Sequence, residues 1–265
     1  SAMKDKFILI DVGNTALKWA TLEDPDNPHT IVHSGEGHFK KELYELWESL
    51  NPSYVLGCTV AAPEIAFSLT KFFNDHHIKW EWVRSALHFR TQNFTIQNAY
   101  HKFKQLGSDR WYAAIGAIAN LREGSLLVVH MGTATTADSI RKISDDQYVF
   151  QGGRIAPGPS LMHSSLLSTV PTLSKTLGPK TQFPDSTETA IATGIIDAQV
   201  GLVLRAMDAM KKEERKAPRV ILAGGAAQFI APHLQQEVPN LIVRHNLVLN
   251  GLAIRARQIL GESNG

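Results

Sequence analysis

The chain has 265 residues, of which 43% are hydrophobic, so it is long enough to bury one large core or two modest ones. Its formal net charge is only +2, and it shows no basic stripe with interleaved aromatic residues, which argues against direct binding to nucleic acid. The single cysteine, Cys58, excludes an internal disulfide and indicates a reducing cytoplasm. Neither a signal peptide nor a membrane span is visible, so we expect a cytoplasmic protein.

The first half of the chain begins with a predicted β-hairpin. Phe7–Ile10 is a short apolar run of β-favouring residues, and the strand-like run Ala16–Thr21 follows the polar turn Asp11–Thr15 directly. The hydrophobic periods then predict, in chain order, a strand at Ile31–Ser34, a helix at Lys40–Leu50, a strand at Tyr54–Val60, a helix at Pro63–His76 and a strand at Lys79–Val83. Arg90–Leu106 is polar without a clean period, and a predicted helix at Tyr112–Leu121 follows it.

The second half repeats this order. A short strand at Ser125–Val129, the turn Gly132–Thr136 and a further strand predict a second hairpin. The elements predicted after it are a strand at Tyr148–Ile155, helices at Gly158–Leu167 and Thr187–Lys211, a strand at Arg219–Leu222, a helix at Phe229–Gln235, a strand at Leu241–Arg244 and a helix at Val248–Leu260. The repeat predicts two α/β domains, residues 3–122 and 123–265, that share a cleft for a nucleotide.

The first turn brings together the residue types that bind a metal-bound phosphate. Asp11 could hold Mg²⁺ or its waters, Gly13 allows close approach of the backbone, and Asn14 and Thr15 can donate hydrogen bonds. An ordinary hairpin turn uses the same residues for backbone reasons alone, so the turn by itself leaves both interpretations open.

Two further glycine turns follow strands, at Gly132–Thr136 and at Gly224-Gly225. Neither they nor the first turn matches the P-loop or G-x-G-x-x-G, so no motif predicts a Walker ATPase or a Rossmann dehydrogenase. We expect two of the turns to bind the triphosphate and the third to lie near the adenosine. For Gly224-Gly225 a plain strand-to-helix turn is the alternative.

Asp109 and Arg110 lie in a short loop at the start of a predicted helix. A carboxylate there could take the proton from a substrate hydroxyl that attacks the γ-phosphate, and the guanidinium could pair with an anionic group of the substrate. The alternative is a helix cap at Ser108 or Asp109 beside an exposed arginine.

A set of short motifs in one order gives the family resemblance. The motifs are DVGNTALK at Asp11–Lys18, NAY at Asn98–Tyr100, LGSDRW at Leu106–Trp111, GTATTAD at Gly132–Asp138, GGRIAPG at Gly152–Gly158, STETAIATG at Ser186–Gly194 and AGG at Ala223–Gly225. Together they resemble the type III pantothenate kinases of the acetate kinase/sugar kinase/Hsp70/actin superfamily. GSDRW followed by GTATT and GGRIAPG is the specific part of the pattern.

The resemblance implies a fold and a reaction. The fold is α/β, with two duplicated ribonuclease H-like (actin-like ATPase) domains around a central cleft. The reaction is ATP-dependent phosphorylation of pantothenate to 4'-phosphopantothenate, the first step of coenzyme A biosynthesis. The resemblance also implies Mg²⁺ or another divalent cation, a monovalent cation such as K⁺ or NH₄⁺, and a cytoplasmic homodimer that binds ATP and pantothenate, without nucleic acid or membrane.

The resemblance also implies a role for each matching residue. Asp109 would be the general base and Asp11 would position Mg²⁺. The residues implied to bind ATP and its phosphates are Gly13, Asn14, Thr15, Lys18, Gly132, Thr133, Thr135, Gly224 and Gly225. Those implied to bind pantothenate are Tyr100, Gly107 and Arg110, together with Thr187 from the neighbouring subunit.

One position departs from the family pattern. Where the family has an aspartate that ligates the monovalent cation, this chain has His130, in the sequence Val129-His130-Met131-Gly132-Thr133. Potassium prefers oxygen ligands, and a neutral imidazole replaces a carboxylate poorly. We hypothesise that a protonated His130, or its hydrogen bond, supplies locally what the ion would supply. The alternative is that His130 only packs at a strand end.

Two other functions fit the same residues. The chain could be a regulatory or accessory protein that keeps the pocket and has lost turnover, or another kinase or phosphatase of the superfamily that acts on a sugar or a polyphosphate. Retention of Asp11, Asp109 and Arg110 favours turnover.

Overall fold

The computed structural model describes residues 7–33, 39 and 41–261, which form two compact units. Unit 1 comprises Ser1–Arg122, Lys142–Phe150 and Asn246–Gly265, and unit 2 comprises Glu123–Arg141 and Gln151–His245. The first break therefore follows residue 122, and the chain then returns twice to unit 1. The division into homologous domains at 3–122 and 123–265 stays a prediction; the ends of the predicted elements at Ser34 and Lys40 lie outside the described residues.

Unit 1 is built on a five-stranded sheet in the order β3-β2-β1-β4-β5. Its strands are β1 (Phe7–Val12), β2 (Ala16–Thr21), β3 (His29–Val32), β4 (Tyr54–Thr59) and β5 (Lys79–Trp82). β1 pairs antiparallel with β2 and parallel with β4, so the predicted first hairpin is confirmed. β1 is buried at nearly every position, as its apolar sequence FILIDV requires.

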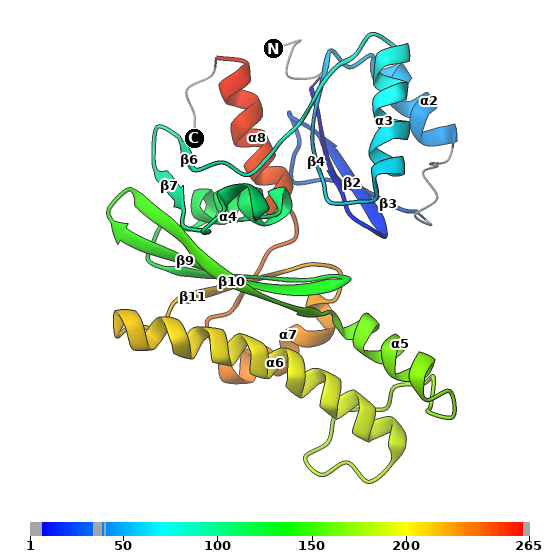
Figure 1. Cartoon of the computed structure of the whole chain (residues 1–265), viewed down its shortest axis with the longest axis vertical. Helices are drawn as coiled ribbons and strands as arrows, with labels where there is room; N and C mark the ends of the chain where they lie inside the picture. Colours follow the sequence, from blue (N-terminus) through cyan, green and yellow to red (C-terminus); the bar gives the residue numbers. More distant parts are fainter. Residues whose placement is uncertain (1–6, 34–38, 40, 262–265) are drawn as a thin grey trace. The chain divides into compact units, whose positions relative to one another are not determined.

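Helices cover both faces of this sheet (Figure 1). Every second residue of β1, namely Ile8, Ile10 and Val12, points to the face covered by α2 (Lys41–Leu50) and α3 (Pro63–Asp75). Trp47 of α2 and Phe73 of α3 are fully buried on this face. α8 (Leu247–Ile259) packs against β1 and β4, and α4 (Ser108–Asn120) packs against α8. The C-terminal helix is thus part of the core of unit 1.

Two glycines allow α4 and α8 to approach closely. A Cβ atom on Gly116 of α4 would lie 2.1 Å from the Leu247 carbonyl oxygen, and one on Gly251 of α8 would lie 2.1 Å from the Tyr112 carbonyl oxygen. Real Cβ atoms do not approach a backbone oxygen so closely, and the two backbones therefore touch only because both positions lack a side chain. This contact fixes α4, whose first turn carries Asp109.

The segment Arg90–Leu106, in which the periodicity predicts no element, is in fact structured. It contains the end of β6 (His88–Arg90), β7 (Thr95–Asn98) and the 3-10 helix η1 (Phe103–Gln105). β7 pairs in parallel with the first residues of β10, so that Phe150 is opposite Asn98. β6 pairs antiparallel with β7 on the other side. β6 and β7 are only three and four residues long, and β10 is remote in sequence, so no local period marks them.

Unit 2 contains the second sheet, whose strands there follow the order β12-β11-β8-β9-β10. They are β8 (Leu126–Met131), β9 (Ala134–Ser144), β10 (Gln147–Pro157), β11 (Arg219–Ala223) and β12 (Ile242–Val243), with the tip of β9 and β10 belonging to unit 1. β8 pairs antiparallel with β9, which confirms the second predicted hairpin. β11 pairs parallel with β8 on its other side.

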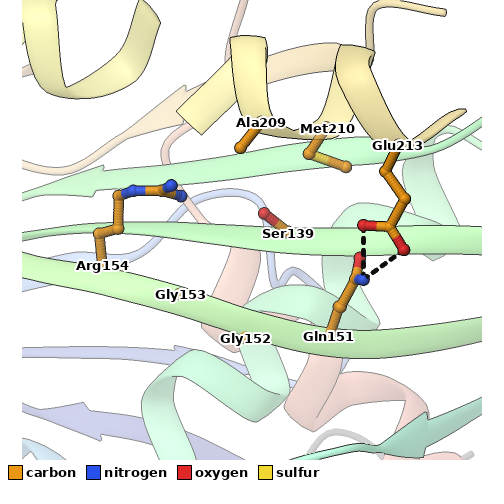
Figure 2. A pocket seen from close by; sticks show the side chains of 8 residues that line it. All are labelled: Ser139, Gln151, Gly152, Gly153, Arg154, Ala209, Met210 and Glu213. Atoms are coloured by element: carbon orange, nitrogen blue, oxygen red, sulfur yellow. Dashed lines mark hydrogen bonds between the residues drawn. The ribbon is translucent and has the colours of Figure 1, made fainter. Parts of the chain in front are cut away.

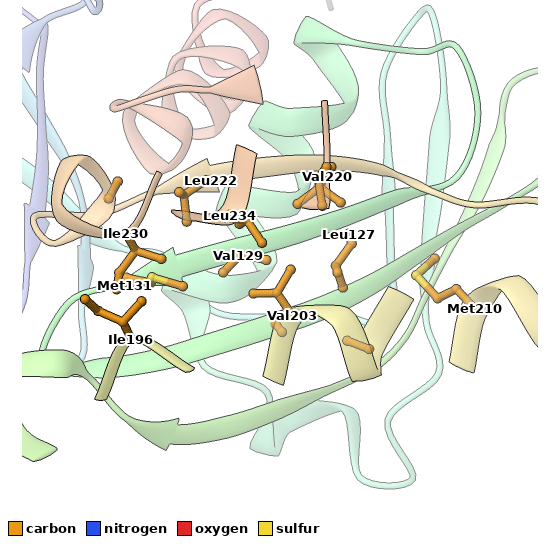
Figure 3. Packing of buried hydrophobic residues seen from close by; sticks show 14 residues of the cluster. Leu127, Val129, Met131, Ile196, Val203, Met210, Val220, Leu222, Ile230 and Leu234 are labelled. Atoms are coloured by element: carbon orange, nitrogen blue, oxygen red, sulfur yellow. The ribbon is translucent and has the colours of Figure 1, made fainter. Parts of the chain in front are cut away.

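Two helices of unit 2 bury an apolar core against these strands (Figure 3). Val203 of α6 (Thr187–Glu214) and Ile230 of α7 (Ala227–Glu237) pack with Val129 of β8. α6 is long and apolar enough to cross a membrane by length and composition alone, but the core helix of a soluble protein passes the same test. α5 (Pro159–Thr169) packs against α6.

Candidate active site

The first glycine turn lies at the carboxyl edge of β1. Asp11 is opposite Cys58 of the parallel strand β4, and both strands end here. The Gly13 N–H closes the turn by donating to the Ala16 carbonyl oxygen over 2.9 Å, while Asn14 and Thr15 are exposed. The turn therefore presents a carboxyl, an amide and a hydroxyl at one sheet edge, as the sequence predicts.

His33, which sequence reasoning missed, holds this turn from outside. Its Nε2–H donates to the Gly13 carbonyl oxygen over 2.8 Å, and its backbone N–H donates to the Thr15 carbonyl oxygen over 2.9 Å. One signal in the sequence could have indicated His33. β3 pairs antiparallel with β2, so that Val32 lies opposite Ala16, and the residue after Val32 therefore comes close to the turn before Ala16.

Asp11 and Asp109 interact electrostatically although they are far apart in sequence. Burial, and next the charge of Asp109, raise the pKa of Asp11 to about 7, and the cation of Lys18 lowers it only in part. Asp11 keeps some solvent exposure. A carboxylate that faces a second carboxylate suits a divalent cation, so the donor set fits Mg²⁺.

Asp109 lies in the first turn of α4. Gly107 is the N-cap of this helix, so the alternative of a side-chain cap at Ser108 or Asp109 is wrong, although Asp109 Oδ1 does accept the Arg110 N–H over 2.9 Å. A Cβ atom on Gly107 would lie 2.7 Å from Asp109 Oδ1, so glycine leaves room for the carboxyl. A 3.1 Å hydrogen bond joins Ser108 Oγ to the Cys58 thiol, whose pKa is raised by burial. Cys58 itself is buried.

Arg110 is buried, with only 8% of its surface exposed. The alternative of an exposed arginine beside a helix cap is therefore wrong. Its Nη1 donates to the Tyr100 hydroxyl over 3.0 Å, and its guanidinium carbon lies 5.7 Å from the Tyr100 ring and 5.9 Å from the Phe150 ring. These contacts orient the guanidinium. The structure thus brings together Tyr100, Gly107 and Arg110, the residues implied to bind pantothenate.

Asn98 supports the loop that carries Tyr100. It is almost fully buried, its Oδ1 accepts the Tyr100 N–H over 3.0 Å, and its Nδ2 donates to the Phe103 carbonyl oxygen over 3.1 Å. The Ser85 hydroxyl donates to the same carbonyl oxygen. Asn98 therefore orders both ends of the segment between β7 and η1, a role that the motif NAY did not reveal.

In unit 2 the turn between β8 and β9 is enclosed by glycines from two other segments. The Gly158 N–H donates to the Thr133 carbonyl oxygen over 2.8 Å, and a Cβ atom on Gly158 would lie 2.0 Å from the Gly132 carbonyl oxygen. Gly224 has φ +105°, and a Cβ atom there would lie 2.3 Å from the Met131 carbonyl oxygen. Gly225 has no such constraint. Gly158 is a site residue that sequence reasoning missed.

The threonines of this turn differ in exposure. Thr133 is exposed, whereas Thr135 is fully buried and donates its hydroxyl hydrogen to Gln199 Oε1 over 2.6 Å. Thr187 is exposed in the first turn of α6, next to Ser186, which forms a capping box with Thr189. A phosphate contact from Thr135 and a pantothenate contact from Thr187 stay predictions.

His130 is exposed near the end of β8, opposite Thr136 of β9 and Ala223 of β11. Its Cε1 would lie 3.0 Å from a Cβ atom placed on Gly132, so the ring borders the turn. Among residues 7–33, 39 and 41–261, no group of three or more His, Cys, Asp or Glu side chains could hold a metal. A metal at either turn would therefore need ligands from water or a phosphate.

A separate hollow of about 410 Å³ lies in unit 2 between α6 and the strands β9 and β10 (Figure 2). Its walls are formed by Ser139, Gln151, Gly152, Gly153, Arg154, Ala209, Met210 and Glu213. Gln151 Nε2 donates to both carboxylate oxygens of Glu213 over 2.9 Å. None of the predicted site residues lines this hollow, so it is distinct from the candidate site.

A family model for type III pantothenate kinase matches residues 7–209. The chain belongs to this family. Proteins named type III pantothenate kinase from Janthinobacterium sp. (strain Marseille) and Nitrosospira multiformis are 34% and 32% identical to it, over 92% and 99% of this chain and 95% of each relative. These matches confirm the family and the enzyme class that the motifs predict. They also confirm the predicted function, which is phosphorylation of pantothenate in coenzyme A biosynthesis.

Solved structures support the fold predicted for a type III pantothenate kinase. A putative Baf family transcriptional activator from Campylobacter jejuni superposes with a TM-score of 0.60 at 20% identity, covering 95% of this chain and 99% of that one. A putative 2-dehydro-3-deoxygalactonokinase from Sinorhizobium meliloti does so with a TM-score of 0.52 at 14% identity, covering 96% and 99%. At these identities the likeness shows the fold alone, and the predicted actin-like α/β class is confirmed.

The raised pKa of Asp11 predicts a pH-dependent gain of stability in Asp11→Asn. The folded-state pKa of about 7 exceeds the ordinary aspartate value of 3.8, so the folded state binds this proton more tightly and loses stability as pH rises between these values. Without metal or nucleotide, the asparagine variant should be more stable than the wild type at pH 8, by about 1–3 kcal/mol, and equally stable near pH 4. Urea unfolding with a chelator present at both pH values measures this difference.

Asp26→Asn, at an exposed position, is the control and should show no such pH-dependent gain. If Asp11→Asn were no more stable than the wild type at pH 8, the ionised Asp11 would not be destabilising in the free protein.

Proposed function

We propose that Asp109 is the general base in the transfer of the γ-phosphoryl group of ATP to the primary hydroxyl of pantothenate. The observation that supports this proposal is the arrangement within unit 1, where Asp109 interacts with Asp11 and is followed directly by the oriented guanidinium of Arg110. A base, a metal-binding carboxylate and an anion-binding group are the parts that phosphoryl transfer to a carboxylate-bearing alcohol requires.

Arg110 and Tyr100 would orient pantothenate. The guanidinium can pair with the substrate carboxylate through two parallel N–H groups, and the Tyr100 hydroxyl already fixes its plane. Binding by Arg110 would bring the substrate hydroxyl to Asp109, and the absence of a side chain at Gly107 leaves space beside that carboxyl. Positioning and proton removal are the main tasks that this reaction leaves to side chains.

Phosphate binding is assigned to the two turns. In unit 1, Asp11 would hold Mg²⁺, and the predicted phosphate contacts come from Gly13, Asn14, Thr15 and Lys18. In unit 2 they come from Gly132, Thr133 and Thr135, with Gly224 and Gly225 near the adenosine. Bound at Asp11, a divalent cation would supply positive charge that neutralises the phosphates. Asp11 would hold it in the ionised form, although burial raises the pKa of this carboxyl in the free protein.

The remaining assignments concern partners and location. We propose a cytoplasmic homodimer in which the exposed Thr187 of one protomer reaches the pantothenate of the other, without nucleic acid or a membrane. We also propose that a monovalent cation, K⁺ or NH₄⁺, is less important here than in relatives that carry aspartate at the position of His130.

Asp109→Asn should lower kcat by roughly two to four decades with the fold intact, because the variant lacks a group that can accept the substrate proton. Coupled detection of ADP with pantothenate, with a panel of sugars and without acceptor measures this and identifies the substrate. Asp208→Asn, on an exposed face of α6, is the control. Turnover near that of the wild type in Asp109→Asn would refute the assignment of the base.

Arg110→Ala should raise the KM for pantothenate at least about tenfold, with a smaller change in kcat, since an ionic hydrogen-bonded contact to substrate is lost. Arg110→Lys keeps the charge but not the planar guanidinium, and it should recover only part of the loss. Initial rates at saturating ATP give both constants, and an unchanged KM in Arg110→Ala would remove Arg110 from the substrate site.

His130 predicts a weak response to potassium. Initial rates over a KCl titration, with NaCl or a large organic cation at matched ionic strength, should change little in the wild type. His130→Asp should introduce dependence on K⁺, because it restores a carboxylate ligand. Strict K⁺ dependence of the wild type, equal to that of relatives with aspartate, would contradict the hypothesis.

A further inference from the structure

Gln199 is a fully buried polar residue in the middle of α6, between apolar neighbours such as Ile196 and Val203. Burying an amide costs free energy unless both its donor and its acceptor are hydrogen-bonded, and an apolar side chain would fill the same space without that requirement. The hydrogen-bond partners of Gln199 therefore indicate what this amide holds in place.

Both ends of the Gln199 amide bind segments that flank the turn between β8 and β9. Oε1 accepts the Thr135 hydroxyl hydrogen over 2.6 Å, and Thr135 lies at the start of β9. Nε2 donates to the Pro157 carbonyl oxygen over 2.9 Å, at the end of β10, and it also lies 3.4 Å from Met162 Sδ in α5. One side chain thus ties α6 to β9 and to β10 at the edge where the turn lies.

The bond to Pro157 reaches the turn through the next residue. The Gly158 N–H donates to the Thr133 carbonyl oxygen, and the Gly158 backbone is so close to the Gly132 carbonyl oxygen that no side chain fits between them. A displacement of Pro157 would therefore move Gly158 and alter the direction in which the Gly132-Thr133 peptide groups point.

We infer that Gln199 is a positioning residue for this turn. The phosphate contact predicted for Thr135 from the family resemblance is then replaced by an indirect role, in which Thr135 acts through Gln199. The inference rests on the proposed function in that it takes Gly132 and Thr133 as phosphate ligands. A buried hydroxyl such as that of Thr135 can support the turn without reaching a ligand. Direct contact with the phosphate would then come from the exposed Thr133 and from backbone N–H groups.

A double-mutant cycle with Gln199→Leu and Thr135→Val tests this inference. The probe is Mg²⁺ with a non-hydrolysable β,γ-imido analogue of ATP, whose Kd is measured by calorimetry on the full chain at a temperature where every variant is folded. Each single variant should weaken binding at least about tenfold, the size expected for the loss of one buried hydrogen bond. The double variant should bind no more weakly than Gln199→Leu alone, because Thr135 then has no amide through which to act.

Two matched variants separate positioning from a general loss of stability. Thr135→Ser keeps the hydroxyl and should bind the analogue as the wild type does. Thr193→Val removes another buried hydroxyl of α6, which accepts the Thr181 N–H over 3.1 Å, and it should lower Tm with an unchanged Kd. In Gln199→Leu the KM for pantothenate should not change. Gln199→Met, which keeps the length of the side chain, replaces Gln199→Leu if that variant does not fold.

Three outcomes would overturn the inference. Wild-type Kd in Gln199→Leu or Gln199→Met would mean that the amide only supports packing. Additive losses in the cycle, or a loss in Thr135→Val that is independent of residue 199, would mean that Thr135 contacts the phosphate itself. Because the cycle measures nucleotide binding, it remains informative if the wild type binds the analogue but does not phosphorylate pantothenate, a result that would contradict the proposed function alone.

Discussion

The close contact between α4 and α8 is the constraint on which the candidate site of unit 1 depends. Asp11 and Asp109 repel each other when both are ionised, and burial makes this repulsion costly. The first turn of α4, which carries Asp109, stays near Asp11 because α4 is packed against α8 at Gly116 and Gly251, where the two backbones touch. Favourable packing along the helix thus offsets an unfavourable pair of charges at its first turn.

The turn in unit 2 is held by a different kind of interaction. Here Gly158 and Gly224 bring other backbone segments against the turn, and a buried amide fixes the strands on either side. The Gly132 N–H also donates to the Ala134 carbonyl oxygen within the turn over 3.0 Å. A phosphate-binding loop needs a backbone that holds its shape, and these contacts provide that support.

Local patterns in the sequence predicted the parts of the molecule whose residues are contiguous. Both hairpins, α3 with its N-terminal proline, and the residues of the two turns follow from short-range signals. β7 could not be predicted in this way, because one of its two partners is Gln147–Phe150 of β10, and β6 lies in the sheet only through its pairing with β7. A motif also cannot show which of its residues are exposed. Thr133 and Thr135 are equivalent in the motif, but in the structure Thr133 is exposed and Thr135 is fully buried.

The residues that sequence reasoning missed share one property, since each acts on a segment far from its own position. His33 binds the Gly13 carbonyl group and Gln199 binds Thr135 and Pro157. In the sequence, each looks like an ordinary polar residue at a strand end or on a helix. Their importance depends on the tertiary contacts alone, and only the structure supplies those.

The return of the chain to unit 1 has a consequence for the order in which the protein can be completed during synthesis. Domains generally begin to fold from the N-terminus as the chain emerges from the ribosome. The helix that supports α4 spans Leu247–Ile259, so it emerges after every strand of both sheets has been made. The first two-thirds of the chain can form hairpins and bury the face of β1 that α2 and α3 cover. The other face of β1, and α4 at Gly116, have no helix packed against them until α8 leaves the exit tunnel. Assembly of the Asp11–Asp109 pair is therefore a late event in the biogenesis of this protein.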